Sequence, residues 1–275
     1  MIKNYKPTSA GIRHRKTLVN NVDAVRPLKS LTTHIKGAVG RNNGRISIRF
    51  RQVGHRKLYR IIDFKRTKFD IPAKVISIQY DPNRGPNIAL VSYLDGEKSY
   101  ILAPEGLKVG MTIMSSQNRI EAIPGNTMPL SHMPLGQPIH NIEINPGAGG
   151  KVARGAGNSA KILAKDGGYV NVKMPSGEVK RFKEDCLATA GVLSNQDLRN
   201  TALGKAGISR HKGHRPHIRG VAIANPSDHP HGGSYKDNGV GMPSPKSPWG
   251  WKTRGMKTRS RTYTNKFIVK DRRVK

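Results

Sequence analysis

The 275-residue chain has few of the residues that build a large core or a covalent framework. Hydrophobic residues make up 35% of it and aromatic residues only 5%, so small cores with appendages are expected instead of one core along the whole length. The single cysteine, Cys186, excludes an internal disulfide framework and suits a reducing compartment.

Segments that would engage a membrane are missing as well. No run approaches the roughly 18 apolar residues that a membrane span requires, and no basic helix carries an opposite face of Trp, Phe or Leu. Residues 1–7 lack the apolar run of a signal peptide. We therefore expect no membrane partner.

Acidic residues are scarce where basic residues are abundant. The 49 Lys and Arg against 17 Asp and Glu give a formal net charge of +32. Residues 1–69 carry +16 and residues 196–275 carry +14, whereas residues 70–195 carry only +2. A free chain of this charge repels itself, and phosphates that neutralise it release condensed counterions. The pattern predicts nucleic-acid binding through two basic flanks.

The nearly neutral middle has the pattern of β-strands. Short runs rich in β-branched residues, or alternating apolar and polar residues, occur at 73–80, 87–93, 98–102, 161–165, 169–174 and 178–182. Asp95-Gly96 and Asp166-Gly167-Gly168 separate neighbouring runs and favour hairpin turns, because glycine accepts positive φ. Strands at this spacing predict small barrels or sandwiches, with a border near Pro124-Gly125-Asn126.

The flanks show little periodicity. From Gly204 to Gly255, glycine, proline, serine, histidine and basic residues leave too little apolar surface to offset the entropy of ordering. Two interpretations stay open: plain disorder, or ordering on a polyanion. The best helix candidate is short, Asn195–Leu203.

Five of the ten histidines fall within 21 positions, at His211, His214, His217, His229 and His231. A zinc site would need four ligands with paired spacing, and the interspersed Lys and Arg would repel a cation. A metal-dependent nucleic-acid enzyme is the alternative, yet no nucleophile or apolar pocket accompanies these histidines. We predict no catalytic residue, no metal and no cofactor.

Two further features suit a nucleic-acid surface. The glycine-rich sequence at 145–157 lets backbone approach a phosphate or a base face closely. Trp249 and Trp251 flank Gly250 in a basic segment, where they stack on bases or fill a hydrophobic gap; both interpretations stay open.

The sequence Asn-Pro-Ser-Asp-His-Pro-His-Gly-Gly at 225–233 closely resembles the bacterial-type family of ribosomal protein number two of the large subunit, a universal rRNA-binding family. Further segments similar to that family lie at 40–46, 59–66, 80–84, 100–104, 138–143, 257–260 and 266–269. Departures from it lie at Gln52-Val53, His211, Ala222–Asn225 and Ser234-Tyr235, where its RNA contacts are expected to differ.

The resemblance implies a mostly β fold of two small barrels. It implies a basic extension over 1–35, an OB-fold-like domain over 36–124, an SH3-like barrel over 125–195 and a basic extension over 196–275. The implied function is that of a structural constituent of the large subunit and not of an enzyme. Such a protein binds rRNA early and supports assembly, subunit association, tRNA binding and the peptidyl-transferase region.

The implied partners are large-subunit rRNA, neighbouring ribosomal proteins and small-subunit rRNA at the subunit interface. The implied location is the cytoplasmic ribosome, with an organellar ribosome as the alternative. A DNA-compacting basic protein is the rival that composition alone leaves open.

We expect rRNA to be bound by basic side chains at Arg13, Arg15, Lys16, Arg41, Arg45, Arg56, Lys57, Arg60, Lys65, Arg66, Lys151, Arg154, Lys205, Arg210, Lys212, Arg215, Arg219, Lys252, Arg259 and Arg261. By the resemblance, a loop reaches towards the peptidyl-transferase region with Asp228, His229, His231, Gly232 and Gly233. The chemistry there belongs to RNA, so His229 is assigned a positioning role.

Overall fold

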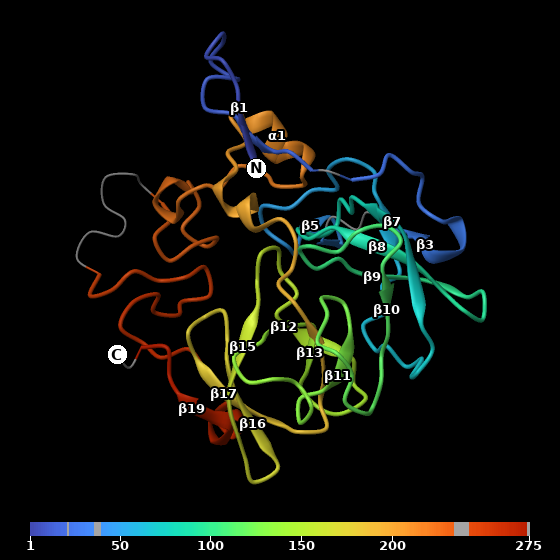
Figure 1. The fold of residues 1–275 in the computed structure, drawn as a ribbon. Helices are drawn as coiled ribbons and strands as arrows, with labels where there is room; N and C mark the ends of the chain where they lie inside the picture. The colour runs from blue at the N-terminus through green and yellow to red at the C-terminus, as the bar shows by residue number, and fades with distance from the viewer. Residues whose placement is uncertain (21, 36–39, 234–241, 274–275) are drawn as a thin grey trace. The chain divides into compact units, whose positions relative to one another are not determined.

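Residues 1–20, 22–35, 40–233 and 242–273 are described by the computed structural model of the chain (Figure 1). The chain divides into two units. The first, which we call the sheet unit, comprises residues 1–36, 56–208 and 264–275. The second, the loop unit, comprises residues 37–55 and 209–263. Segments far apart in the sequence are therefore joined in each unit.

A four-stranded antiparallel sheet begins the strand-rich part of the sheet unit. Its order is β10 (Thr112–Ile113), β7 (Ala73–Gln79), β8 (Ile88–Tyr93) and β9 (Lys98–Leu102). Strand β8 is covered on both faces, since Ala89 and Val91 join one buried cluster whereas Ile88 and Leu90 join another. This double burial explains the continuous apolar run in its sequence.

A seven-stranded antiparallel sheet follows. Its order is β11 (Thr127–Pro129), β18 (Leu187–Ala190), β12 (Pro138–His140), β15 (Ala160–Asp166), β16 (Tyr169–Lys173), β17 (Val179–Lys183) and β19 (Ile268–Lys270). In β16, Val170 and Val172 point into the core while Tyr169 and Lys173 face solvent, as the alternating sequence predicts.

The hairpin turns form where the sequence places them. Asp166 pairs with Tyr169, so the loop between β15 and β16 is Gly167-Gly168, with φ of +55° and +77°. Positive φ at both central residues is the requirement of the tight turn that matches strand twist. Gly96, between β8 and β9, has φ +84°.

The remaining elements are short. Two-stranded pairs form between β1 (Ile2–Asn4) and β2 (Lys16–Leu18), β3 (Thr32–His34) and β6 (Leu58–Arg60), β4 (Arg41–Asn42) and β5 (Arg45–Ile46), and β13 (Ile142–Glu143) and β14 (Gly150–Val152). Helical turns are η1 (Lys29–Leu31), η2 (Gln196–Asn200), α1 (Ala206–His211), η3 (Gly220–Ala222) and η4 (Thr262–Phe267). The predicted fold class, a mostly β chain of small barrels with long irregular extensions, is confirmed.

Two local predictions are wrong. The expected helix at 195–203 is only the 3-10 turn η2, because Asn195 adopts the left-handed conformation before it and Thr201 is extended after it. The α-helix instead follows Gly204, inside a stretch that was expected to be irregular. The C-terminal extension also supplies β19, whose three residues pair with β17 and are too few to give a periodic signal.

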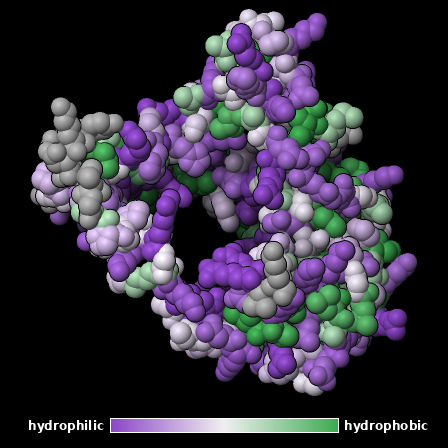
Figure 2. Space-filling model, turned by 90° about the vertical axis from the view of Figure 1, so that its left-hand side faces the viewer, coloured by the Kyte–Doolittle hydropathy of each residue, from purple (hydrophilic) through white to green (hydrophobic). Residues whose placement is uncertain are grey.

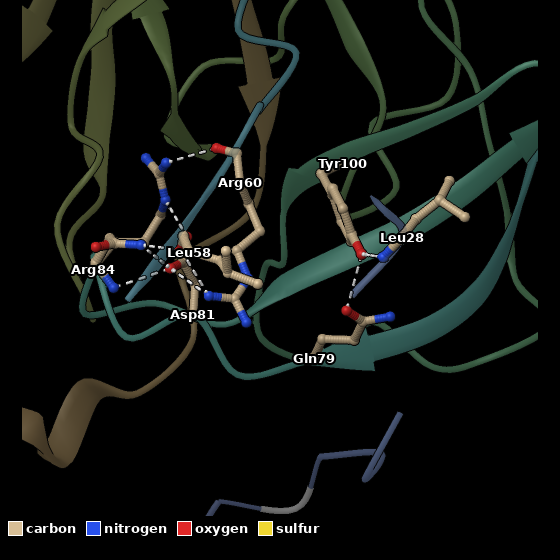
Figure 3. A network of polar contacts seen from close by, with 8 residues as sticks. Leu28, Leu58, Arg60, Gln79, Asp81, Arg84 and Tyr100 are labelled. Carbon is tan, nitrogen blue, oxygen red and sulfur yellow. Dashed lines mark hydrogen bonds and ion pairs between the residues drawn. The ribbon is translucent and has the colours of Figure 1, made fainter. Parts of the chain in front are cut away.

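Tyr100 joins the first sheet to the segment before it (Figure 3). Its hydroxyl donates to Oε1 of Gln79 and accepts from the amide of Leu28, each at 3.0 Å. The side chain is fully buried. A buried hydroxyl with both partners in place stabilises the fold. If it is removed, the buried donor and acceptor lose their hydrogen bonds and cannot replace them with bonds to water.

We predict that Tyr100→Phe lowers the free energy of unfolding by about 1–3 kcal/mol, because the amide of Leu28 and Oε1 of Gln79 lose their partner. Chemical unfolding followed by circular dichroism measures this. Tyr93→Phe is the matched control, since the buried Tyr93 hydroxyl has no hydrogen-bond partner among the described residues. Equal losses in the two variants would contradict the role given to the Tyr100 hydroxyl.

Candidate nucleic-acid interface

Most of the predicted RNA-binding side chains reach solvent. Those classed as exposed are Arg13, Lys16, Arg56, Lys65, Lys151, Arg154, Lys205, Arg210, Lys212, Arg215, Arg219, Lys252, Arg259 and Arg261. Arg15, Lys57 and Arg60 are half-buried, and the side chains of Arg41 and Arg45 lie outside the description. Hydrophilic residues dominate the face seen in Figure 2, with hydrophobic patches between them.

Arg66 is a correction to the predicted set. Its side chain is 3% exposed, with Nε donating to Oγ of Ser115 at 2.9 Å and a terminal nitrogen donating to the carbonyl of Gly125 at 3.3 Å. Burial lowers the pKa of this guanidinium. A side chain committed to two internal acceptors is structural, so we remove Arg66 from the RNA-binding residues.

The turn before Arg66 decides which side chains face outwards. The Asp63 carboxylate accepts the amides of Lys65 and Arg66 at 3.0 and 2.8 Å. Arg66 then has φ +54°, which sends its side chain inwards while Lys65 stays exposed. The sequence alone could not show that Lys65 is exposed and Arg66 is buried, because both residues belong to one basic run.

A groove of about 790 Å³ brings predicted residues together within the sheet unit. Lys65 lines it from one side, and Lys151 and Arg154 line it from the glycine-rich loop. The amide of Gly150 donates to the carbonyl of Phe64 at 2.9 Å, which attaches the loop to the segment that carries Lys65. Lys68 also lines the groove, but it forms ion pairs with Asp95 and Glu97.

Aromatic rings hold guanidinium groups beside this groove. The guanidinium carbon of Arg154 lies 4.4 Å from the centre of the Phe64 ring, and that of Arg84 lies 5.7 Å from it. Arg84 also lies 5.4 Å from the Tyr59 ring. Cation–π contacts of this kind keep a planar, charged group oriented. Sequence reasoning missed Arg84, whose only signal was its place in the family-like segment at 80–84.

The buried carboxylate of Asp81 fixes the position of Arg84 beside these aromatic rings (Figure 3). It accepts Nε of Arg84 at 2.6 Å and the amide of Asn83 at 2.9 Å. Arg60 lies 3.8 Å from it and donates to the carbonyl of Leu58 at 2.9 Å. The half-buried Arg60 therefore shapes the protein as well as presenting charge.

The glycine-rich loop is held by a buried carboxylate. Glu143 accepts the amides of Gly147 at 3.2 Å, Gly149 at 2.8 Å and Leu187 at 3.1 Å. Three donors satisfy an anion whose burial would otherwise be unfavourable. The loop thus has a defined shape before any ligand binds, and it carries Lys151 and Arg154 exposed.

Near the N-terminus, Tyr5 arranges two cations. The Arg15 guanidinium carbon lies 4.9 Å and the Lys3 ammonium 5.4 Å from the centre of its ring. The Tyr5 hydroxyl is hydrogen-bonded to that of Thr17 at 3.0 Å. Gly204 packs against this segment, since an added Cβ would lie 2.7 Å from the carbonyl oxygen of Gly11. The predicted Arg15 and Lys16 are therefore on a folded segment.

In the loop unit, four arginines surround a cavity of about 930 Å³. Arg49, Arg51, Arg210 and Arg215 line it together with apolar residues such as Phe50. Arg210 and Arg215 were predicted, whereas Arg49 and Arg51, which flank Phe50, were missed. The backbone of Phe50 has φ +58°, and its ring lies 4.4 Å from that of His217.

Two departures from the family pattern lie side by side in the loop unit. The Gln52 side-chain amide donates to the carbonyl of Arg210 at 2.7 Å, and the amide of His55 donates to that of His211 at 2.9 Å. The rings of His55 and His211 are 4.4 Å apart. The unusual residues at 52 and 211 therefore belong to one local contact. The departure at Ser234-Tyr235 lies outside the described residues.

The loop at 225–233 is shaped by its two histidines. His229 is 7% exposed, and its Nδ1 accepts the amide of His231 at 3.0 Å. Nε2 of His231 accepts the amide of Lys246 at 2.7 Å. Burial lowers the pKa of His229, so the ring is neutral near pH 7 and Nδ1 stays free to accept. Gly220 allows the ring to pack closely, because a Cβ there would meet His229 Cε1 at 2.3 Å.

No group of three or more His, Cys, Asp or Glu could hold a metal ion within the described ranges. The helices in the described part of the chain also include none long and apolar enough to cross a membrane.

The comparisons with known proteins cover both basic regions. A family described as "Ribosomal Proteins L2, RNA binding N-terminal domain" matches residues 28–115, and "Ribosomal Proteins L2, C-terminal domain" matches residues 123–250. The chain is 49% identical over 277 residues to "Large ribosomal subunit protein uL2" of Phenylobacterium zucineum (strain HLK1), across 100% of this chain and 98% of the relative. This chain belongs to the ribosomal L2 family. It is a ribosomal protein of the large subunit with an RNA-binding domain.

The L2 matches divide the predicted residues. Arg56, Arg60 and Lys65 lie in the match to the L2 RNA-binding domain, whereas Lys151 and Arg154 lie in the L2 C-terminal domain match. The groove between them therefore joins the two matched domains. The L2 C-terminal domain match also contains the loop at 225–233, whereas residues 1–27 and 251–275 lie outside both matches.

His140, within the L2 C-terminal domain match, is fully buried beside Gly191, and its Nδ1 lies 2.9 Å from the Gly191 carbonyl oxygen. Burial lowers its pKa from 6.5 to about 4, and the nearby Arg66 adds to that effect. Folding therefore favours the neutral ring. The contribution of the neutral His140 ring to the free energy of unfolding is fully present above about pH 6.5 and is lost as the pH falls towards 4.

We predict that the free energy of unfolding falls more steeply in the unmodified chain than in His140→Gln as the pH is lowered from 6.5 to 4. Glutamine can keep an N–H donor for Gly191 but takes up no proton in this range. The extra slope is at most about 1.4 kcal/mol per pH unit. Denaturant unfolding at several pH values gives both curves, and parallel curves would contradict the prediction.

Proposed function

We propose that this chain is a structural, non-catalytic constituent of the large ribosomal subunit that binds its rRNA directly and early in assembly. The observation that carries the proposal is the groove lined by Lys65, Lys151 and Arg154. These exposed basic side chains come from distant segments of the chain, and the Phe64 ring beside the groove holds the guanidinium of Arg154. Planar guanidinium forks match phosphate geometry, and lysine adds point charge. The name of the relative, a large ribosomal subunit protein, supports the same partner.

Further roles belong to this proposal. The chain supports subunit association, tRNA binding and the peptidyl-transferase region, with neighbouring ribosomal proteins and small-subunit rRNA at the subunit interface as additional partners. Its place is the cytoplasmic ribosome. A net charge of +32 supports a position among several rRNA segments, because one phosphate patch would neutralise only part of it.

We propose domain borders at 1–35, 36–124, 125–195 and 196–275. The four-stranded sheet lies within the second range, and six of the seven strands of the larger sheet lie within the third. The gap between the two family matches, at 116–122, supports a border near 124. The loop unit takes residues from both sides of these borders, since it combines 37–55 with 209–263.

A DNA-compacting protein would have a similar charge. Competition between large-subunit rRNA and duplex DNA for the chain therefore distinguishes that function from the proposed one. At physiological salt, large-subunit rRNA is expected to displace the chain from duplex DNA of equal phosphate content, because the groove and loops present shaped surfaces in addition to charge. Equal competition by the two nucleic acids would overturn the proposal.

Adjacent residues provide a matched test of the groove. We predict that Lys65→Gln weakens rRNA binding and reduces the dependence of log affinity on log salt by roughly 0.7–0.9, because one phosphate is no longer neutralised. Unfolding stability is expected to stay unchanged, because Lys65 is exposed. Filter binding over a salt series measures the slope, and an unchanged slope would show that Lys65 does not contact phosphate.

The neighbouring Arg66→Gln should give the reverse result. Removal of its guanidinium leaves Ser115 and Gly125 without their buried donor, so stability falls by about 1–3 kcal/mol while the salt slope of the folded protein stays the same. A reduced salt slope in this variant would restore Arg66 to the RNA-binding residues.

The loop at 225–233 gives a test of the positioning role of His229. We predict that His229→Ala leaves the sheet unit folded but slows peptide-bond formation by reconstituted large subunits, because the amide of His231 loses its acceptor. His229→Asn keeps an acceptor near Nδ1 and is expected to retain most of the rate. If both variants lose the same activity, the imidazole itself is required and the positioning role is wrong.

A further inference from the structure

Residues 245–253 of the loop unit form a turn held by its own hydrogen bonds. The amide of Ser247 donates to the carbonyl of Trp251 at 2.8 Å, and that of Gly250 donates to the carbonyl of Ser247 at 2.9 Å. Both the amide and the hydroxyl of Thr253 donate to the carbonyl of Pro245, at 2.9 and 3.0 Å. Gly250 has φ +83°, a conformation that the turn requires of it.

This turn presents two large aromatic side chains to solvent. Trp249 is 76% exposed and Trp251 is 64% exposed, although tryptophan is usually buried for most of its surface. Of the two interpretations that the sequence left open, the filling of a hydrophobic gap does not fit these exposures. Two exposed indoles on an internally bonded turn are instead available to a partner.

The charge around the turn indicates the chemistry of that partner. Residues 242–261 contain six Lys and Arg and no Asp or Glu. Lys252 and Arg254, next to the indoles, are exposed. The partner must therefore offer negative charge and flat apolar faces at neighbouring positions, which is the combination found in single-stranded nucleic acid. In a duplex the base faces are covered by their neighbours.

We propose that Trp249 and Trp251 stack on unpaired bases of large-subunit rRNA, with Lys252 and Arg254 on the adjoining phosphates. The inference rests on the proposed function and narrows it, because it assigns this turn to single-stranded rRNA. The indoles supply affinity that does not depend on salt, whereas the cations supply the salt-dependent part.

The two tryptophans are the only ones in the chain, so their fluorescence reports on this turn alone. The full chain is titrated with an unstructured oligo(A) of about 12 nucleotides, with a blunt RNA duplex of equal phosphate content, and with large-subunit rRNA. Stacking quenches indole emission. We expect quenching by the oligonucleotide and by rRNA, and binding of the duplex without quenching.

Variants separate stacking from simple apolar contact. Trp249→Ala with Trp251→Ala is expected to weaken oligonucleotide binding roughly 5- to 150-fold per base unstacked, at an unchanged salt slope. Replacing both by Phe should restore most of the affinity, and replacing both by Leu should not. Lys252→Gln is the matched control, with quenching retained and the salt slope reduced. Circular dichroism checks that each variant folds, which the exposure of both indoles favours.

The possible results distinguish failure of base stacking from failure of the proposed function. If the chain binds rRNA but shows no quenching and the Ala variant binds equally well, this inference is overturned while the proposed function stands. If the Leu variant binds as tightly as the Phe variant, the turn is an apolar contact, as for a neighbouring protein, and stacking is overturned. If the unmodified chain prefers neither rRNA nor oligonucleotide over duplex DNA, the proposed function itself fails.

Discussion

Electrostatic self-repulsion is the constraint on which the structure depends. A chain with a net charge of +32 cannot gather its lysines and arginines around one core, so nearly all the buried hydrophobic residues come from the nearly neutral middle. That middle supplies the whole four-stranded sheet and all of the seven-stranded sheet except β19. Strand β8 is buried on both faces, which makes the first core from few residues. The basic C-terminal segment is attached to this scaffold by the short pairing of β19 with β17.

Three of the acidic residues bind the backbone of basic turns and loops. Each accepts hydrogen bonds from backbone amides in a turn or loop that carries basic side chains; the three are Asp63, Asp81 and Glu143. A carboxylate that is occupied by N–H donors fixes the loop, and nearby lysines such as Lys151 stay exposed. The scarce negative charge thus shapes the loops, and the exposed positive charge remains available for phosphate.

The sequence was sufficient to predict what local chemistry decides. Alternation in β16 and the Gly167-Gly168 turn are local properties, and both appear as expected. The family-like segments likewise indicated the right family. Long-range geometry was not predictable. Nothing local distinguishes exposed Lys65 from buried Arg66, and Arg84 is placed by contacts with the rings of Phe64 and Tyr59, which lie far from it in the sequence. Three residues of β19 carried too little signal to reveal their partner, β17.

The pairing of β19 with β17 has a consequence for synthesis on the ribosome. Strands β11 to β18 have all emerged once residue 190 leaves the exit tunnel, but the outer edge of β17 stays uncovered until residues 268–270 follow. During that interval the nascent chain displays an open row of backbone donors and acceptors, the kind of edge at which chains pair wrongly. Translation of the basic C-terminal segment thus delays the moment at which the sheet is sealed.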